Sequence, residues 1–579
     1  MPDRIRDLES LWQLDLSDCS KFEKFPEKGG NMKSLKWLYL KNTAIKDLPD
    51  SIGDLESLRR LDLSDCSKWL DLSDCSKFEK FLEKGGNMKR LRDLSLKNTA
   101  IKDLPDSIGD FESLWQLDLS DCSKFEKFPK KGGNMKSLKR LYLKNTAIKD
   151  LPDSIGDLES LRRLDISDCS KFEKFPEKEG NMKKKGGNMK SLKRLYLKNT
   201  AIKDLPDSIG DLESLRRLDL SDCSKFEKFP EKGGNMKSLW KLSLKNTAIK
   251  DLPDSIGDLE SLEGREHEKF MEAFFKNTAI KDLPDSIGDL ESLWFLDLSD
   301  CSKFKKFPEK GGNMKSLKRL YLKNTAIKDL PDSIGDLESL RRLDLSDCSK
   351  FEKFPIGDLE SLWFLDLSDC SKFKKFPEKG GNMKSLMELR LKITAIKSLP
   401  TNISRLKNLK RLILGGCSDL WEGLISNQLC NLQKLNISQC KMAGQILVLP
   451  SSLKVIDARH CTSKEDLSGL LWLCHLNWLK STTEELKCWK LGALIPESNG
   501  IPEWIRYQNM GSEVTTELPT NWYEDPDFLG FVVSCVYRHN PTSDYCDLEC
   551  ELNLDGNGFE FKDGCWFQCR CEAMVVLKI

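Results

Sequence analysis

The sequence has almost no net charge, and this balance argues against functions that depend on a long-range electrostatic field. Its 93 Lys and Arg residues are opposed by 92 Asp and Glu, which leaves a formal charge of +1 although 32% of the residues are charged. Proteins that bind nucleic acid or anionic membranes usually carry a clear basic excess. The composition therefore predicts neither a nucleic-acid partner nor a membrane partner.

Long apolar runs are also missing. A membrane-spanning helix needs about 20 consecutive apolar residues, whereas the best run, LSGLLWLCHLNWL from Leu467, stops at 13. The opening MPDRIRDLESL lacks the apolar segment of a secretory signal. We therefore expect no membrane span, no secretion, and a core position for the run at Leu467.

Histidine is scarce, and the motifs of catalysis are absent. The four histidines, His267, His460, His475 and His539, are scattered and form neither a triad nor an H-E-x-x-H pair. The recurrent GGNMKS, first at Gly29 to Ser34, lacks the G-x-x-x-x-G-K-[ST] pattern of a phosphate-binding loop and predicts a turn. The sequence predicts no enzyme activity and no cofactor.

What the sequence has in abundance is one repeated unit. Residues Leu11 to Ser57 recur almost verbatim, so that pairs such as Cys19 and Cys66, or Cys122 and Cys169, lie 47 residues apart. Each unit consists of two repeats, of 24 and 23 residues, and both open with L-x-x-L-x-L. A fixed period of this length indicates a repeat architecture.

The L-x-L alternation predicts a short strand with one buried face, because Leu14 and Leu16 must point the same way. Such a strand cannot bury its own leucines, so neighbouring repeats must stack into a parallel sheet. We predict an α/β leucine-rich-repeat solenoid, a horseshoe with the sheet on its concave face, over residues 1–461 in about 19 repeats. The strands are expected to begin near Leu11, Leu35, Leu58, Leu91, Leu114, Leu138, Leu161, Leu192, Leu215, Leu239, Phe270, Leu293, Leu317, Leu340, Leu362, Leu386, Leu409, Leu432 and Leu453.

The array contains irregular places. It begins in mid-repeat, which predicts an exposed leucine edge at Leu11, Leu14 and Leu16. Insertions interrupt it around Trp69 to Lys77 and near Met182 to Asn188. After Leu262 the repeat pattern is interrupted by the segment EGREHEKFMEAFF. Within it, Phe270, Ala273 and Phe275 are expected to supply a poor strand.

Most of the 21 cysteines fall in one column rather than in a disulfide pattern. Nine occupy the same place in L-S-D-C or I-S-D-C units, at Cys19, 66, 75, 122, 169, 223, 301, 348 and 370. Equivalent positions of a solenoid lie on one side, where a buried thiol behaves as a small hydrophobe. We expect reduced, structural thiols in a cytosolic or nuclear protein.

The last part of the chain changes character. Residues 462–494 are expected to close the array with helical or irregular structure, and residues 495–579 show the short alternating runs of an all-β domain. The runs CDLECELNL and GFEFKDGCWFQCRCE predict a strand pair. Its cysteines, Cys546, Cys550, Cys565, Cys569 and Cys571, miss the spacing of zinc ribbons, so we expect core thiols there, with a zinc site as the alternative.

The concave face is the first candidate site. Stacking places Gln13, Trp37 and Arg60 in one row and Asp15, Tyr39 and Asp62 in the next, with Asp and Tyr expected to form a hydrogen-bonded ladder. Aromatic and Arg side chains are enriched at protein interfaces, although a merely solvated face is the alternative. The candidate partner-binding residues on this face are Trp37, Tyr39, Arg140, Tyr142, Arg194, Tyr196, Arg319, Tyr321, Arg390 and Arg411.

The repeated C-S-K-F-E-K-F-P and T-A-I-K-D-L-P-D-S-I-G-D-L segments resemble the leucine-rich repeats of plant Toll/interleukin-1-receptor-type intracellular immune receptors. The tail from LKCWKLGALIPESNGIPEWIRYQNMGSEVTTELPTNWYEDPDF to GFVVSCVY is similar to their C-terminal jelly-roll/Ig-like domain, the C-JID domain. The signalling and nucleotide-binding domains of such receptors do not occur in this sequence.

The resemblance implies recognition of a pathogen effector, or of a guarded host protein, in plant defence. Because the repeats are so alike, we expect specificity to come from the divergent strands near Arg390 and Arg411 and from the C-terminal domain, with Trp504 and Tyr523 as candidate contacts. The alternative is a truncated scaffold or decoy that binds without signalling. A zinc-dependent enzyme at the C-terminal cysteines comes third.

Overall fold

A computed structural model of the chain describes most of the repeats and parts of the C-terminal region. The chain divides into two compact units, unit 1 of Met1–Leu340 and unit 2 of Arg341–Ile579. The described residues are 8–26, 32–66, 78, 81–82, 88–130, 134–176, 189–231, 236–259, 270–377, 382–397, 399, 403–418, 420, 429–440, 450, 452–457, 490–494, 531–536, 546–550, 565–569 and 573–578.

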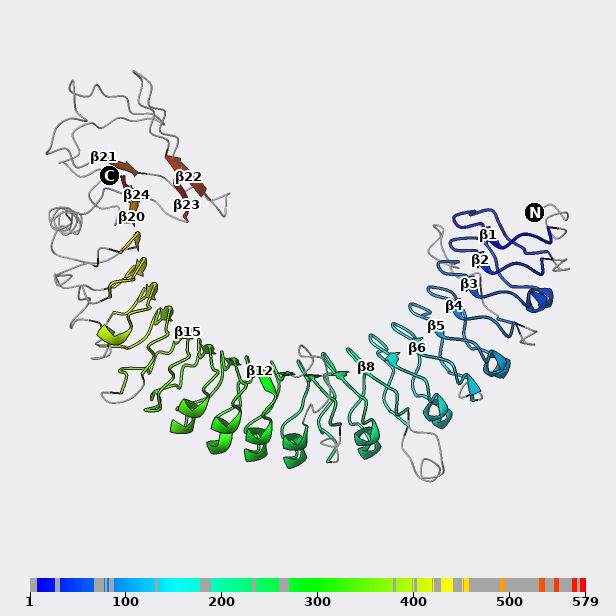
Figure 1. The fold of residues 1–579 in the computed structure, drawn as a ribbon, viewed down its shortest axis with the longest axis horizontal. Coiled ribbons are helices and arrows are strands. Elements are labelled where there is room, and N and C mark those ends of the chain that lie inside the picture. The colour runs from blue at the N-terminus through cyan, green and yellow to red at the C-terminus, as the bar shows by residue number, and fades with distance from the viewer. Residues whose placement is uncertain are drawn as a thin grey trace, which may run out of the picture. The chain divides into compact units, whose positions relative to one another are not determined.

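Unit 1 is a solenoid whose strands form a parallel sheet, as Figure 1 shows. Each strand pairs in register with the strand of the next repeat, so that Leu14 lies opposite Leu38, and Leu38 opposite Leu61. Most strands have only three residues because the chain turns away directly after each L-x-L. The strands are β1 Gln13–Asp15, β2 Trp37–Tyr39, β3 Arg60–Asp62, β4 Asp93–Ser95, β5 Gln116–Asp118, β6 Arg140–Tyr142, β7 Arg163–Asp165, β8 Arg194–Tyr196, β9 Arg217–Asp219, β10 Lys241–Ser243, β11 Met271–Phe274, β12 Leu293–Asp297 and β13 Arg319–Tyr321.

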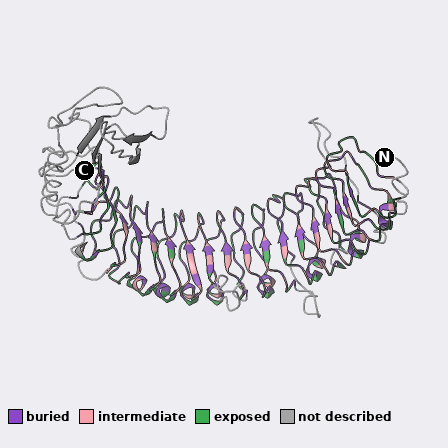
Figure 2. Ribbon diagram, turned by 45° about the horizontal axis from the view of Figure 1, so that its top comes forward, coloured by how far each residue is buried: buried purple, intermediate pink, exposed green. Residues whose placement is uncertain are grey.

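The core of unit 1 lies behind this sheet. The central leucine of each strand is buried, as are the leucines on either side of it, for example Leu138, Leu141 and Leu143 at 0% exposure. Figure 2 shows the result as strands that carry both buried and partly exposed residues. Phenylalanines of alternate repeats, such as Phe125 and Phe172, are fully buried as well. One repeat therefore covers the apolar face of the next.

Short 3-10 helices form the side opposite the strands in unit 1 (Figure 1). Most have the sequence DSIGD and follow a proline, such as Pro152, whose fixed φ of −68° sets the chain direction. Gly257 in one of them is required by close packing, because a Cβ there would lie 2.2 Å from the Ser286 carbonyl oxygen. Among the described residues no connection is an α-helix. The helices are η2 Asp50–Asp54, η3 Asp106–Asp110, η5 Asp153–Asp157, η6 Asp207–Asp211, η8 Asp254–Asp258, η10 Asp285–Asp289, η11 Glu309–Asn313 and η12 Asp332–Asp336.

Unit 2 continues with the same repeat geometry and then changes. Its strands β14 Arg342–Asp344, β15 Phe364–Asp366, β16 Glu388–Arg390, β17 Arg411–Ile413, β18 Lys434–Asn436 and β19 Val455–Asp457 pair in parallel, with η13 Ile403–Arg405 as a 3-10 turn. The next strand, β20 Lys490–Leu494, pairs in parallel with β19. The leucine-rich-repeat solenoid predicted from the sequence is confirmed.

The C-terminal strands of unit 2 are antiparallel. Strand β24 Ala573–Lys578 pairs with both β20 and β21 Phe531–Val536. Strands β22 Cys546–Cys550 and β23 Cys565–Cys569 form the predicted pair, with Cys546 opposite Cys569. The expected closing segment and the remaining parts of residues 495–579 lie outside the described residues.

Two sequence-based expectations need correction. Phe270 was expected in the core, but it is 39% exposed, and Met271 is buried in its place because the register of β11 shifts against β12 at Met271. Cys19 was placed in the buried column but is exposed, since the thiols of the column are covered by a preceding repeat and no described repeat precedes this one. The insertions near Trp69 and Met182 lie outside the described residues.

Candidate functional site

The outward side chains of the strands in unit 1 form two rows. The upstream row holds the residue before each central leucine, and the downstream row holds the residue after it. The register places Gln13 beside Trp37 and Asp15 beside Tyr39, as predicted. The upstream row reads Gln13, Trp37, Arg60, Asp93, Gln116, Arg140, Arg163, Arg194, Arg217, Lys241, Glu272, Phe295 and Arg319. The downstream row reads Asp15, Tyr39, Asp62, Ser95, Asp118, Tyr142, Asp165, Tyr196, Asp219, Ser243, Phe274, Asp297 and Tyr321.

Arginine and tyrosine side chains contact one another across these rows. The Arg163 guanidinium lies between two rings, 5.1 Å from the centroid of Tyr142 and 4.7 Å from that of Tyr196. Arg217 donates to the Tyr196 hydroxyl at 3.3 Å. Cation–π contacts of this kind contribute about 0.5–1 kcal/mol each at exposed sites. They hold the long side chains in defined positions on the face.

The aspartates of the downstream row have a different partner from the one predicted. Instead of a ladder with tyrosine, the Oδ1 atom of Asp118 accepts from the backbone N–H of Ser120 at 2.9 Å, and that of Asp219 accepts from Ser221 at 3.0 Å. Arg163 adds a 3.1 Å ion pair to Asp165 within its own strand. The carboxylates therefore fix the turn at the strand end.

The upstream row becomes strongly basic between β6 and β9. Four successive strands place Arg140, Arg163, Arg194 and Arg217 side by side, and the residue before each of them is also Lys or Arg. We call these eight residues the basic band: Lys139, Arg140, Arg162, Arg163, Lys193, Arg194, Arg216 and Arg217. The band ends at Lys241, whose ammonium forms a 2.8 Å ion pair with Glu272.

Aromatic side chains gather on the next strands, from β11 to β13. The ring centroids of Phe274 and Phe295 are 4.8 Å apart, and those of Phe295 and Tyr321 are 5.4 Å apart. Phe270 lies 6.5 Å from Trp294. We call these five residues the aromatic cluster. No other part of the described strand face in unit 1 holds so many adjacent rings.

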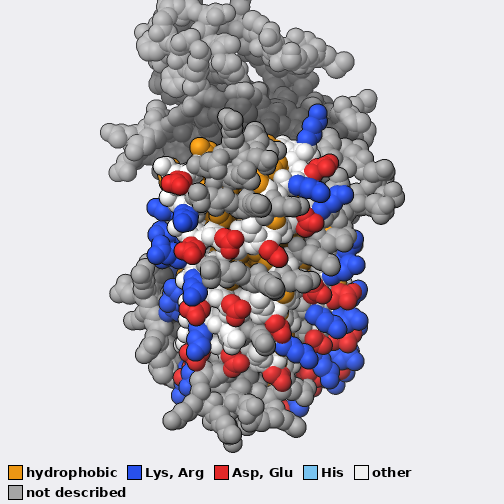
Figure 3. Space-filling view, turned by 90° about the vertical axis from the view of Figure 1, so that its right-hand side faces the viewer, with side chains coloured by type: hydrophobic (Ala, Val, Ile, Leu, Met, Phe, Trp, Pro, Cys, Tyr) orange, Lys and Arg blue, Asp and Glu red, His pale blue; other side chains and the backbone are white. Residues whose placement is uncertain are grey.

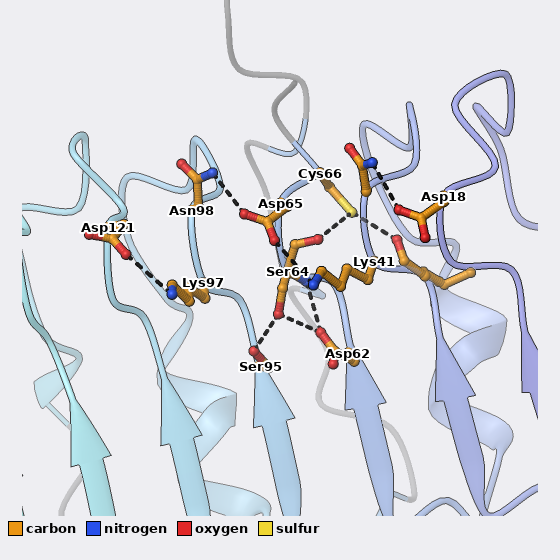
Figure 4. Close-up of polar contacts among 12 residues, drawn as sticks. Asp18, Lys41, Asp62, Ser64, Asp65, Cys66, Ser95, Lys97, Asn98 and Asp121 are labelled. Atoms are coloured by element: carbon orange, nitrogen blue, oxygen red, sulfur yellow. Dashed lines mark hydrogen bonds and ion pairs between the residues drawn. The ribbon is translucent and has the colours of Figure 1, made fainter. Parts of the chain in front are cut away.

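A polar ladder follows the strand ends, where the chain turns (Figure 4). Asp65 accepts from the Asn98 side chain at 2.9 Å and lies 3.8 Å from the Lys41 ammonium, so that one carboxylate joins repeats on both sides. Both Asp65 and Asn98 have positive φ, 57° and 54°, a region that Asn and Asp tolerate better than other side chains.

The same ladder recurs at Asp121, Asp168, Asp222 and Asp300. At Asp300, burial acts to raise the pKa, but the hydrogen bond from Asn324 and the nearby Lys276 ammonium outweigh it, so the pKa is lowered. Asp300 is therefore charged at neutral pH, and all the aspartates of the ladder already have partners. On the face drawn in Figure 3, acidic and basic side chains likewise lie beside one another. We assign the ladder to the stability of the solenoid.

Behind the ladder, cysteine and threonine alternate in the buried column. A Cys-type repeat carries L-S-D-C and a Thr-type repeat carries K-N-T. The Cys122 thiol donates to the carbonyl of Leu96 at 3.0 Å and lies 3.4 Å from the Thr99 hydroxyl of the preceding repeat. Burial raises the pKa of the Cys122 thiol to about 11. Such thiols are protonated and covered, so they are structural, as predicted.

Unit 2 holds a separate charged network on its strand face. Arg390 bonds to Glu388 through Nε at 2.7 Å, and Arg411 reaches the same carboxylate at 3.3 Å. Phe364 lies under two guanidinium groups, 3.8 Å from that of Arg342 and 5.0 Å from that of Arg390. Burial raises the pKa of Asp366, which lies opposite Arg390 in the sheet.

All ten candidate residues from the repeats lie on the strand face. The structure brings together Trp37 with Tyr39, Arg140 with Tyr142, and Arg194 with Tyr196 on shared strands, and Arg390 with Arg411 through Glu388. Arg319 lies over the Trp294 ring at 5.1 Å. Trp504 and Tyr523 lie outside the described residues.

Sequence reasoning missed Arg163, Arg217, Phe274 and Phe295. The sequence contains a pattern that could have identified each pair. For the arginines, two adjacent basic residues recur before the central leucine of each repeat from Lys139 to Arg217. For the phenylalanines, an aromatic residue replaces the usual polar residue in segments such as L-W-F-L-D.

Among the residues that the structure describes there is neither a metal site nor a membrane-spanning helix. Among the described residues no group of three or more His, Cys, Asp or Glu could hold a metal ion. The side chains of the five C-terminal cysteines lie outside that description. Within the same residues, no helix combines the length and apolar character needed to cross a bilayer.

Comparison with known proteins gives three family matches. A leucine-rich repeat region matches residues 66–184 and 164–272, and a C-JID domain matches residues 496–575. Residues 289–358 match the leucine-rich repeats described as disease resistance protein RPS4B-like.

Individual relatives agree with these matches. The chain is 65% identical over 138 residues to disease resistance protein RPV1 of Vitis rotundifolia, which covers 23% of this chain and 10% of that protein. It is also 65% identical over 131 residues to RUN1 of the same species, which covers 22% and 10%. The matched part thus spans about a tenth of these curated relatives.

A solved structure also resembles the chain. It is the leucine-rich-repeat protein LIC12759 of Leptospira interrogans, with a TM-score of 0.47 and 22% identity over 82% of this chain and 96% of that one.

Proposed function

The chain carries the leucine-rich repeats and C-JID domain of a plant Toll/interleukin-1-receptor-type disease resistance protein, and on that premise we propose that it recognises a protein partner in plant defence. The partner would be a pathogen effector or a host protein on which an effector acts. The observation that carries the proposal is the strand face, where arginine and aromatic side chains are held in defined positions over many adjacent repeats. Solenoids commonly use such surfaces for binding.

We further propose that recognition takes place in the cytosol or nucleus. The cysteines from Cys19 to Cys440 whose side chains the structure describes are free, and all of them except Cys19 and Cys430 are buried. Free thiols are usual in reducing compartments. The proposed function requires binding alone and no catalytic step by this chain.

Specificity is proposed to come from unit 2 and its C-terminal domain. Arg390 and Arg411 share Glu388, an arrangement that is not seen among the described residues of unit 1. Trp504 and Tyr523 of the C-JID segment would add aromatic contacts. Aromatic and arginine side chains dominate binding energy at many interfaces.

Proximity labelling in infected leaf tissue tests this proposal. The full chain, fused to a biotin ligase, would be compared with an R390A/R411A variant and with a W504A/Y523A variant. We expect a protein from the host or the pathogen to be labelled by the unaltered chain, and its labelling to fall at least about tenfold in both variants.

The matched control is K171A/K225A, which removes two exposed lysines from the turns that follow β7 and β9. Labelling of the same protein by all forms would refute a role for these residues. Absence of any specifically labelled protein during infection would refute the proposed function itself.

A further inference from the structure

The strand face of unit 1 is less regular than its repeats suggest. The basic band on β6 to β9 lies beside the Lys241–Glu272 ion pair, and the aromatic cluster on β11 to β13 follows directly. The chain as a whole is nearly neutral. The band therefore concentrates positive charge in one place on a protein that has no general basic excess.

Two cations of the band lack counter-charges. Among the residues that the structure describes, Arg162 and Arg194 form no ion pair or side-chain hydrogen bond. Arg140 contacts the Gln116 amide oxygen at 3.4 Å and the Trp115 ring at 4.4 Å, and it interacts electrostatically with Asp93 on β4. The strands that carry these cations lie about 4.8 Å apart, and like charges on neighbouring strands repel one another. An anionic ligand would relieve this repulsion.

The aromatic cluster offers an apolar surface with charged edges. Phe270 is 39% exposed, and the other four rings are partly exposed. The Lys241 ammonium lies 4.6 Å from the centroid of Phe274, and Lys318 lies 5.4 Å from that of Phe270. Exposed aromatic groups bordered by cations are typical of sites that hold one apolar anchor of a partner.

The two features have a fixed separation. From the middle of the band, between β7 and β8, to the middle of the cluster, near β12, the sheet advances by about four to five strands, or roughly 20 Å. An extended peptide covers that distance in about six residues at roughly 3.4 Å each. A single extended segment could therefore reach both.

We propose that this surface binds an extended acidic segment of a protein partner. Carboxylates of the segment lie on the basic band, and one aromatic or large aliphatic side chain, about six residues away, packs on the aromatic cluster. The inference rests on the proposed function and names the chemistry of the partner. Nucleic acid fits less well, because Asp165 and Asp219 border the band and would repel the charge that every nucleotide carries, whereas a peptide can place uncharged residues beside them.

Selection from a phage-displayed library of random 12-residue peptides tests the proposal on the purified full chain. We expect the selected peptides to be enriched in Asp and Glu, with an aromatic or large aliphatic residue about six positions from the acidic group. Fluorescence anisotropy with the best peptide should show binding at least about tenfold weaker to R140E/R194E.

The variants are designed to keep the fold. F295Q gives L-W-Q-L-D, the sequence of the repeats at Leu11 and Leu114, and it should remove the enrichment in apolar anchors while leaving the acidic preference. K171E/K225E makes the same charge change as R140E/R194E at exposed turn positions in the same region and should bind the peptide like the unaltered chain.

Three results would overturn the proposal. These are a selected pool without acidic enrichment, equal loss of binding in R140E/R194E and K171E/K225E, and tighter binding of a single-stranded oligonucleotide than of the best peptide. None of them requires the plant partner, so specific labelling in leaf tissue would still support the proposed function if this inference failed.

Discussion

Each buried thiol of the column packs against the preceding repeat, which makes a single side chain sensitive to that contact. We predict that Cys122→Ser lowers the free energy of unfolding by about 1–3 kcal/mol, because a hydroxyl costs more to bury than a thiol and sits farther from the Leu96 carbonyl. Urea denaturation followed by circular dichroism measures the change.

Cys19→Ser is the matched control for this substitution. It makes the same chemical change at an exposed position of the column and should leave stability within about 0.5 kcal/mol of the unaltered chain. A similar loss in both variants would show that burial is not the cause. Added reducing agent should also have little effect on the repeats, because their described cysteines, from Cys19 to Cys440, are free.

The same thiol predicts a pH dependence. The pKa of Cys122 is raised from 9.0 to about 11, because burial disfavours the thiolate. Above pH 9 the unfolded chain releases this proton while the folded chain retains it, so folding loses stability as the pH rises from 9 to 11. The loss should approach about 2–3 kcal/mol for this group.

Comparison of Cys122→Ala with the unaltered chain isolates that effect from the titration of lysine and tyrosine. The difference in unfolding free energy between the two proteins should shrink as the pH rises from 9 to 11. A difference that stays constant over this range would mean that the thiol titrates normally in the folded protein.

At the level of a single repeat, the turn after each strand depends on a left-handed residue. Asn145 has a φ of 55°, and its side chain donates to Asp121 at 3.1 Å. We predict that Asn145→Ala destabilises the chain by about 1–2 kcal/mol more than Asn145→Gly. The Cβ atom of alanine is strained in a left-handed backbone conformation, whereas glycine has no Cβ atom. Denaturation midpoints of the two variants give the comparison.

Lys144→Ala provides a reference at the neighbouring position. It removes an exposed ion pair of 3.5 Å to Asp168, which should be worth less than about 0.5 kcal/mol. If Asn145→Ala and Asn145→Gly were equally destabilising, the lost hydrogen bond, and not the backbone, would determine the stability of this turn.

Much of the repeat could be predicted because its fixed period allows only a few arrangements of neighbouring strands. The L-x-L pattern determined which residues are buried, and its recurrence at Leu14, Leu38 and Leu61 determined the register. The rows of candidate residues followed from the same spacing. The C-terminal strand pair was predictable because Cys546–Cys550 and Cys565–Cys569 are short runs of alternating side-chain type, and turn residues lie between them.

The remaining features depend on contacts that a period does not encode. The exposure of Phe270 follows from a register shift at Met271, where the array is irregular. The aspartates bind backbone N–H groups rather than tyrosine because the turn brings Ser120 within 2.9 Å of Asp118, a local geometry that strand parity does not reveal. The basic band and aromatic cluster appear only when successive repeats are placed side by side.

For the whole molecule, cooperation between neighbours determines local stability. Among the described strands, β1 pairs with β2 alone, and Trp12 beside it is 54% exposed. Strands β6 to β9 have a partner on both sides. In the 579-residue polypeptide, we predict that amides of β1 and β2 exchange hydrogen at least about tenfold faster than those of β7 and β8.

Hydrogen exchange followed by mass spectrometry measures β1 and β7 from peptides that reach a residue unique to each copy. Peptides that include Leu8 identify β1, and peptides that include Glu179 identify β7, because the strand segments themselves recur in other repeats. The peptides around β1 and β7 differ little in sequence, so intrinsic exchange rates can be matched closely. Equal protection in the two regions would indicate that the first repeats are held by contacts outside the described residues.

The pairing of thiol with threonine bears on how the gene can change in length. In the regular 47-residue pairs the Cys-type repeat rests on a Thr-type repeat, as Cys169 does on Thr146, so recombination between misaligned copies conserves these contacts only when it is in phase with the pair. A crossover out of phase brings two Cys-type repeats together, as at Cys348 and Cys370, where the second thiol keeps its bond to a carbonyl but loses the hydroxyl. Alleles of this gene are therefore expected to differ by whole pairs of repeats, so that the length of the strand face varies between individuals while the packing of its repeats stays the same.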